Sequence, residues 1–159
     1  LEDISLDLNN HDISELIVET IKFISPYANK NQVYIESEIE KGIIVKLDKD
    51  KFKEVLLNII DNSIKYRDPN KANSFVYIKL ERVQDKILII LEDNGIGIEE
   101  NNLSNIFNQG FRVLDHMKLD GQGIGLAIVK NIINKHNWNI YVNSKEGLGT
   151  SFTIEIPLL

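Results

Sequence analysis

The chain has 159 residues, of which 43% are hydrophobic and 26% charged, and it contains no cysteine. That size and balance fit one globular domain rather than a disordered chain, and the lack of cysteine excludes disulfides, thiolate zinc sites and cysteine nucleophiles. The net charge of −6 argues against nucleic-acid binding through a basic surface, and the longest apolar run, from Ile87 to Leu91, is too short for a membrane span of about 20 residues.

The first half of the chain carries helical and strand patterns in alternation. Apolar residues recur at helical spacing in two segments, and we expect Pro26 to disturb the end of the first helix. Asp48 or Asp50 can cap the second. The two strands between the helices are joined through Lys41 and Gly42. In order, we predict an irregular linker over residues 1–10, a helix over 13–28, strands over 33–39 and 43–47, and a helix over 52–64.

The second half predicts two hairpins and two further helices. Their order is a hairpin of strands 75–83 and 86–92, a short helix over 99–107, a polar irregular segment over 109–122, a helix over 124–136, and a hairpin of strands 138–143 and 150–156. This mixture predicts an α/β (α+β) two-layer sandwich, in which helices cover one face of a mixed sheet.

Two glycine clusters lie close to predicted turns. Gly95 and Gly97 follow Asp93, and Gly121, Gly123 and Gly125 lead into the last predicted helix. A helix N-terminus offers unpaired N–H groups and partial positive charge, which suit phosphate. The second cluster is equally typical of a plain turn before a helix, and it matches neither the Rossmann nor the Walker pattern.

Asp93 and two asparagines offer oxygen atoms to a ligand. Asp93 ends an apolar strand, where it is either a turn residue or an acceptor for an adenine amine. An unpaired buried acceptor costs about 1–3 kcal/mol, so the second role would discriminate against guanine. Asn58 and Asn62 lie four residues apart on one helix and face the same side, and Lys65 and Tyr66 follow one turn later. Amide oxygens suit Mg²⁺ and lysine suits phosphate, although this asparagine-rich chain also makes a chance pair plausible.

Together these motifs resemble the ATP-binding catalytic domain of sensor histidine kinases, in the superfamily that also holds DNA gyrase, MutL and the heat-shock chaperone ATPases. The likeness runs from about Ile13 to the C-terminus. It rests on five segments: 58–66 (NIIDNSIKY) resembles the N box, 93–97 (DNGIG) the first glycine box, 107–112 (FNQGFR) the F box, 121–128 (GQGIGLAI) the second glycine box, and 147–150 (GLGT) the box that closes the domain.

The resemblance implies a Mg-ATP site between the 52–64 helix and a lid over residues 108–122. It implies that Asn62 is the main Mg²⁺ ligand, with Asn58 and Gln122 as further ligands, and that Arg112 reaches the terminal phosphate. The implied catalytic residues are Asn58, Lys65 and Arg112. The implied nucleotide-binding residues are Asn58, Asn62, Lys65, Tyr66, Asp93, Gly95, Gly97, Ile98, Phe107, Arg112, Gly121, Gln122, Gly123, Ile124, Gly125, Leu126 and Thr150.

Three positions differ from patterns common among the relatives that the resemblance names. Gln122 stands where threonine is frequent and Ser63 where alanine is frequent, and neither change removes a charge or a glycine. The hydrolysing members of the superfamily carry glutamate at the position of Asn58. Asparagine cannot act as a general base, which argues against rapid ATP hydrolysis.

The resemblance also implies what this chain needs from elsewhere. The family's phosphoacceptor histidine lies on a separate helical dimerisation domain, whereas we expect His11, His116 and His136 to have surface or capping roles. With Met117 as the only methionine and Leu1 as the first residue, we expect a piece of a longer protein. Residues 1–10 would link an upstream dimerisation domain to a catalytic domain over 11–159.

The resemblance implies a homodimeric parent protein that phosphorylates a response regulator. The catalytic domain would be cytoplasmic, in a parent that can be membrane-anchored, and would itself touch neither membrane nor nucleic acid. Two alternatives remain open: a serine kinase of the anti-sigma-factor type, and a non-catalytic nucleotide-binding interaction module.

Overall fold

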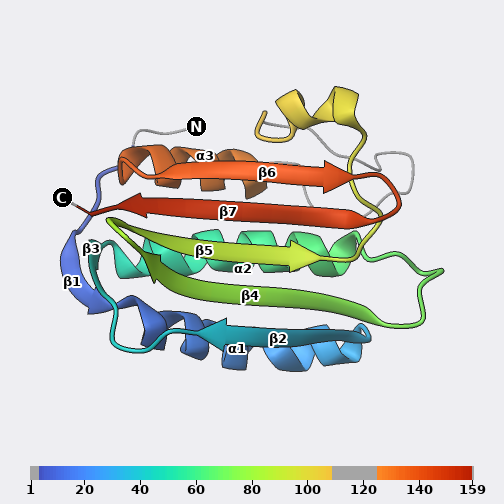
Figure 1. Cartoon of the computed structure of the whole chain (residues 1–159), viewed down its shortest axis with the longest axis horizontal. Helices are drawn as coiled ribbons and strands as arrows, with labels where there is room; N and C mark the ends of the chain where they lie inside the picture. Colours follow the sequence, from blue (N-terminus) through green and yellow to red (C-terminus); the bar gives the residue numbers. More distant parts are fainter. Residues whose placement is uncertain (1–3, 109–124, 159) are drawn as a thin grey trace.

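The computed structural model describes residues 4–108 and 125–158. One layer is a mixed sheet, and the helices α1, α2 and α3 pack on one of its faces (Figure 1). This arrangement confirms the predicted two-layer sandwich. The elements in chain order are β1 (Asn9–Asp12), α1 (Ile13–Lys30), β2 (Val33–Ile39), β3 (Ile44–Leu47), α2 (Lys49–Lys65), β4 (Ser74–Val83), β5 (Lys86–Asp93), the 3₁₀ helix η1 (Glu100–Asn105), α3 (Gly125–Lys135), β6 (Asn139–Lys145) and β7 (Gly149–Pro157).

The five-stranded sheet has the order β2-β4-β5-β7-β6, in which β2 runs parallel to β4 and the other neighbours are antiparallel. Alternate residues of the central strands, such as Ile87, Ile89 and Leu91 of β5, are buried under the helices. Each fully buried side chain of this size contributes about 1.5–3 kcal/mol. The β5–β7 register places Asp93 opposite Thr150, so two predicted site residues share one end of the sheet.

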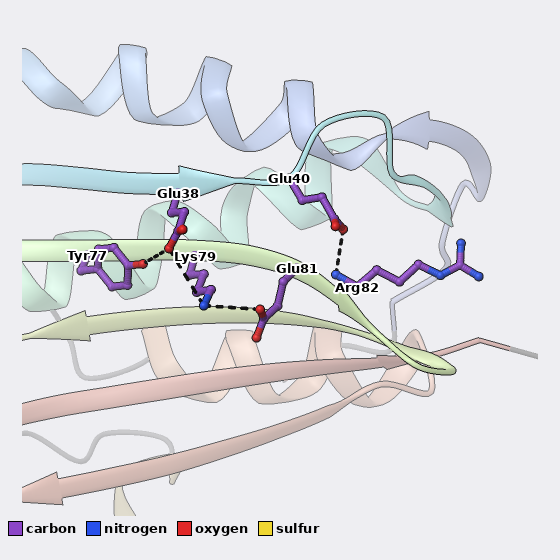
Figure 2. Close-up of polar contacts among 6 residues, drawn as sticks. All are labelled: Glu38, Glu40, Tyr77, Lys79, Glu81 and Arg82. Atoms are coloured by element: carbon purple, nitrogen blue, oxygen red, sulfur yellow. Dashed lines mark hydrogen bonds and ion pairs between the residues drawn. The ribbon is translucent and has the colours of Figure 1, made fainter.

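The helix-free face of the sheet is polar at the β2–β4 edge (Figure 2). The Tyr77 hydroxyl donates to Glu38 Oε2 at 2.6 Å, and Lys79 Nζ lies 4.0 Å from Glu38 and 3.4 Å from Glu81. The Glu38 hydrogen bond, with some burial, raises the pKa of Tyr77. Exposed ion pairs of this kind each contribute about 0–1 kcal/mol to the free energy of unfolding, so they make this face hydrophilic but add little to stability.

The N-terminal region differs from the sequence prediction. Asn9 and Asn10, predicted to be irregular, lie in β1, which pairs antiparallel with β3 in a separate two-stranded sheet. The predicted strands β2 and β3 both form, but in different sheets. The polar sequence of β1 shows no apolar alternation, because this strand is specified by its partner rather than by a buried face of its own.

Pro26 does not disturb α1, which continues to Lys30. A proline inside a helix deprives the carbonyl four residues earlier of its N–H partner. That carbonyl belongs to Lys22, an exposed residue, so water can satisfy it. The neighbouring carbonyl of Ile21 accepts from the Ser25 hydroxyl at 2.6 Å.

Helix α2 begins after Asp48, whose carboxylate accepts the N–H of Lys51 at 3.1 Å, so Asp48 rather than Asp50 is the cap. The face that includes Phe52, Leu56 and Ile60 is buried against the sheet and the neighbouring helices. Within residues 4–108 and 125–158, no helix has the length and apolar content to cross a bilayer.

Candidate functional site

Helix α2 presents its predicted ligand residues on one half-buried face. Asn58 and Asn62 lie one turn apart, and Lys65 follows in the last turn. Tyr66 ends the helix, and its N–H donates to the Asn62 carbonyl at 2.9 Å. Lys65 Nζ lies 2.9 Å from Asp61 Oδ2, so this ammonium already has an anionic partner. A phosphate that binds Lys65 therefore has to compete with the Asp61 carboxylate.

Asp93 is a half-buried acceptor at the end of β5. Its Oδ1 accepts the backbone N–H of Gly95 at 2.9 Å and that of Thr150 at 3.2 Å. Burial raises the pKa of Asp93, and hydrogen bonds from Gly95, the Ser63 hydroxyl and Thr150, with the charge of Lys71, oppose that rise. Both backbone bonds use one carboxylate oxygen, Oδ1.

Two glycines bring the turn after β5 into contact with the β6–β7 turn. Gly97 has φ +75°, and a Cβ there would collide with the Lys145 carbonyl. Gly149 has φ +133°, and a Cβ there would collide with the Asp93 carbonyl. The two turns are also joined by a 2.7 Å hydrogen bond from Gly147 N–H to the Ile96 carbonyl. The glycines therefore shape the wall around Asp93, as the resemblance implied for Gly97.

Ser144 of β6 organises the same wall, and the sequence reasoning missed it. Its Oγ accepts the N–H of Ile98 at 2.8 Å and lies 2.9 Å from the Gly149 carbonyl and 2.8 Å from Thr150 Oγ1. A carbonyl only accepts, so the single Ser144 proton goes to Gly149 and the Thr150 hydroxyl must donate to Ser144. Thr150 Oγ1 therefore offers lone pairs, and no proton, to a ligand. The sequence did offer one signal for Ser144, because it continues the alternation of the inward-facing Ile140 and Val142 on β6.

Helix α3 begins against the ligand face of α2. A Cβ on Gly125 would lie 3.1 Å from Asn58 Oδ1, so the first residue of α3 touches a predicted ligand residue. Leu126 packs against the hydrophobic core. The ring of Phe107 makes an edge contact with Phe152 at 6.3 Å between centroids, and Lys130 Nζ lies 5.5 Å from the Phe107 centroid. Phe107 thus ties the segment after η1 to β7 and α3.

The described residues bring two groups of predicted site residues to one end of the sheet. One group lies on α2 and the start of α3, and the other lies around Asp93; Ser63 joins them because its hydroxyl faces the Asp93 carboxyl. Within the described parts of the chain, no cluster of three or more histidine, aspartate or glutamate side chains could hold a metal ion. A cation here would depend on amide oxygens. The predicted residues that lie outside the described part are Arg112, His116, Gly121, Gln122, Gly123 and Ile124.

His136 has the capping role that the sequence predicted, and a tertiary contact in addition. Its Nε2 accepts the N–H of Asp48 at 3.1 Å, and its Nδ1 lies 2.9 Å from the Ile132 carbonyl. These two bonds fix a neutral tautomer with the proton on Nδ1. The end of α3 is therefore bonded to the residue that caps α2.

The chain is similar in sequence to curated sensor kinases. The chain is 34% identical over 160 residues to the sensor protein kinase WalK of Staphylococcus aureus, covering 96% of this chain and 38% of that relative. Against WalK of strain JH9 it covers 26% of the relative. The chain thus spans well under half the length of the curated relatives that it matches.

Solved structures with less than 25% identity share the fold. Full-length ShkA in complex with AMPPNP superposes with a TM-score of 0.81 at 22% identity, covering 98% of this chain and 32% of that one. The mycobacterial sensor histidine kinase MprB superposes with a TM-score of 0.80 at 23% identity, covering 94% and 97%. Residues 47–159 match the family described as histidine kinase-, DNA gyrase B- and HSP90-like ATPase. The chain belongs to this ATPase family, as its motifs predicted.

Proposed function

We propose that this domain binds Mg-ATP between α2 and the segment over residues 108–122, and delivers the γ-phosphoryl group to a histidine on a separate dimerisation domain. The observation that carries the proposal is the half-buried Asp93 carboxylate, held by Gly95 and Thr150 beside the asparagine-bearing helix α2. Family membership, the likeness to the sensor kinase WalK, and the AMPPNP complex of the structurally similar ShkA support it.

The Asp93 wall suits adenine rather than guanine. Asp93 and Thr150 Oγ1 both present lone pairs, and adenine presents its exocyclic amine as a donor. Guanine would place a carbonyl oxygen at the same point, so acceptors would face an acceptor. A buried unpaired acceptor costs about 1–3 kcal/mol, which corresponds to roughly tenfold or better selectivity.

The α2 face suits a phosphate-bound cation. The oxygens of Asn58 and Asn62, with Gln122 as a further candidate, would hold Mg²⁺, which prefers oxygen ligands and retains water. Mg²⁺ supplies charge neutralisation when bound. Lys65 would exchange Asp61 for a phosphate, and Arg112 would meet the terminal phosphate. Phosphoryl transfer depends mainly on such positioning and charge stabilisation, and Asn58 cannot act as a base toward water.

The same proposal includes a phosphoacceptor histidine outside this domain and a response regulator that receives the phosphoryl group. The parent protein would be a homodimer and can be membrane-anchored. Residues 1–10 would connect this catalytic domain to the dimerisation domain. WalK is a sensor protein kinase, and the solved complex of the histidine kinase ThkA with the response regulator TrrA, at a TM-score of 0.75, contains the same fold. Both relatives support a parent protein in which this domain binds nucleotide, while the dimerisation domain and a response regulator accept the phosphoryl group.

Calorimetric titration with Mg-AMPPNP, and in a separate assay phosphotransfer from Mg-ATP to a separately supplied dimerisation domain, test the proposal. We expect saturable binding and an acid-labile phosphohistidine on the added domain. An exposed-residue variant, Asn143→Ala, is the matched control and should retain both. Absence of binding at millimolar nucleotide would contradict the proposal, and acid-stable phosphate on a protein serine would favour a serine kinase. Binding without any transfer would favour the interaction module.

A further inference from the structure

Lys71 lies in the loop between α2 and β4 and holds two other loops by their backbone. Its Nζ donates to the carbonyls of Asn94 at 2.7 Å, Gly95 at 3.2 Å and Leu148 at 3.4 Å. An ammonium group has three protons, and here three carbonyls face them. Two of the carbonyls follow β5, and the third belongs to the β6–β7 turn, so one side chain ties three loops together.

Neighbouring bonds make this tie rigid at both ends. The Lys71 N–H donates to the Asp68 carbonyl at 3.1 Å, which closes its own loop. The Asn94 side chain accepts from Phe75 N–H at 2.9 Å and donates to the Asn73 carbonyl at 2.7 Å, so the turn after β5 is also bonded to the start of β4. The position of the ammonium is therefore set by backbone on every side.

The same ammonium acts on Asp93 through its charge. Three groups donate hydrogen bonds to Asp93: the Ser63 hydroxyl on α2, the Gly95 N–H in the turn after β5, and the Thr150 N–H on β7. The charge of Lys71, in the α2–β4 loop, also acts on Asp93. Burial raises the pKa of Asp93, and the positive charge of Lys71 is among the effects that lower it. The sequence motifs assigned no role to Lys71.

We propose that Lys71 is a positioning residue for purine binding, which fixes the two turns around Asp93 through its three backbone hydrogen bonds. This inference rests on the proposed role of Asp93 as the adenine acceptor. Without Lys71 the turns lose their shared donor, and the carboxylate loses a cation that favours its charged form. Both effects weaken the adenine contact, and the second does so in a pH-dependent manner.

The variant Lys71→Met keeps the aliphatic stem and removes the charge and its three hydrogen bonds. We expect it to bind Mg-ADP about tenfold more weakly at neutral pH, with the acid limb of binding shifted to higher pH. Lys71→Arg keeps the charge and should keep the position of the acid limb. Lys46→Met, which removes an exposed lysine of β3, is the control and should match the parent chain.

Two measurements separate this role from a purely structural one. Calorimetry between about pH 4 and pH 8, which spans the carboxyl range, gives the affinity, and carboxyl ¹³C NMR follows the Asp93 titration without nucleotide. A parent-like affinity and Asp93 titration in Lys71→Met would overturn the inference. If Lys71→Met unfolds, Lys71→Gln with the same readouts takes its place. Failure of the parent chain to bind Mg-ADP would defeat the proposed function, whereas the NMR titration would still test the electrostatic action of Lys71.

Discussion

At the scale of single residues, the direction of one hydroxyl proton sets the chemistry of the candidate site. Ser144 has one proton and three polar neighbours, so Thr150 must donate to it and present lone pairs elsewhere. The motif that ends in Thr150 marks the position, but the direction of its hydroxyl depends on Ser144, six residues away on the neighbouring strand.

Replacing Ser144 should therefore change specificity. In Ser144→Ala the Thr150 hydroxyl is free to rotate and can donate to a purine carbonyl, so we expect the ratio of GDP to ADP dissociation constants to fall about tenfold. Calorimetry with both nucleotides measures the ratio. Asn143→Ala, an exposed neighbour on the same strand, is the control. An unchanged ratio in Ser144→Ala would show that Thr150 does not meet the base.

Asp93→Asn tests the acceptor itself. The amide oxygen can still accept the N–H groups of Gly95 and Thr150, so the fold should survive. The new NH₂ group would place a hydrogen-bond donor opposite the adenine amine, which is also a donor, and the negative charge of Asp93 would be lost. We expect affinity for Mg-ADP to fall by roughly tenfold to a hundredfold, because a hydrogen bond to a charged group contributes about 1.5–3 kcal/mol. Undiminished affinity, with an unchanged melting temperature, would refute the role of Asp93.

The sequence predicts roles for Asp93, Thr150 and the α2 asparagines because each stands in a local motif. It missed Ser144 and Lys71 because their contacts depend on register and loop packing. Ser144 meets Ile98 across 46 positions of the chain, and Lys71 meets Leu148 across 77. Periodicity describes the face that a residue occupies, but it does not describe which backbone group a distant loop brings to it.

At the scale of elements, turns join neighbouring strands and helix ends join neighbouring helices. The turn after β5 touches the β6–β7 turn at Gly97, and the end of α3 is bonded to the cap of α2 through His136. Helix and strand patterns placed most of these elements, and β1 was missed because its polar residues show no period. Each contact gives a stability prediction with a matched control.

Gly97→Ala should destabilise the domain more than Gly42→Ala does. Both glycines have nearly the same positive φ, +75° and +76°, but only the Gly97 position lies against a backbone carbonyl, and no atom lies within 4 Å of the added carbon at Gly42. Shared backbone strain of about 1–3 kcal/mol thus cancels in the comparison. The excess in free energy of unfolding, measured by urea denaturation, reports the contact between the turns. Equal losses would show that the turns separate easily.

His136 should make stability pH-dependent. Burial lowers its pKa, although the Ile132 carbonyl and the Asp48 charge oppose that effect. As pH falls below the usual histidine value, the unfolded chain binds a proton before the folded chain does, so the free energy of unfolding decreases. Protonation also turns Nε2 into a donor that faces the Asp48 N–H.

Urea denaturation across about pH 5–8 measures this effect. In His136→Gln the side-chain oxygen can still accept from Asp48, and we expect the decrease over this range to become smaller than in the parent chain. His11→Gln, which also removes one imidazole, is the control. A decrease of the same size in His136→Gln as in the parent would assign the pH dependence to other groups.

At the scale of the whole molecule, the two-layer sandwich and its helix-free face followed from the alternation of helical and strand patterns. The assignment of β2 and β3 to different sheets did not, because strand pairing is a tertiary property that neither strand encodes alone. Residues 109–122, which include the predicted Arg112 and Gln122, lie outside the described residues, so those two roles remain predictions.

The chain by itself should bind nucleotide without labelling itself. Of the two histidines in the described residues, His136 has both ring nitrogens engaged, and His11 lies in β1, outside the sheet that carries Asp93. His116 lies outside the described residues. We expect no acid-labile label on the chain after incubation with Mg-ATP carrying a radioactive γ-phosphate, and labelling once a histidine-bearing dimerisation domain is added. Label on the isolated chain would locate an acceptor within these 159 residues.

The anchoring of Asp7 has a mechanical consequence. Its N–H donates to Asp48 Oδ2 at 2.9 Å. The following strand β1 pairs with β3, and Asp48 is the residue directly after β3. A displacement of the backbone at Asp7 is therefore transmitted directly to the residue that caps α2. The movement of Asp7 is thus coupled, through hydrogen bonds and a short stretch of backbone, to helix α2, which carries Asn58 and Asn62.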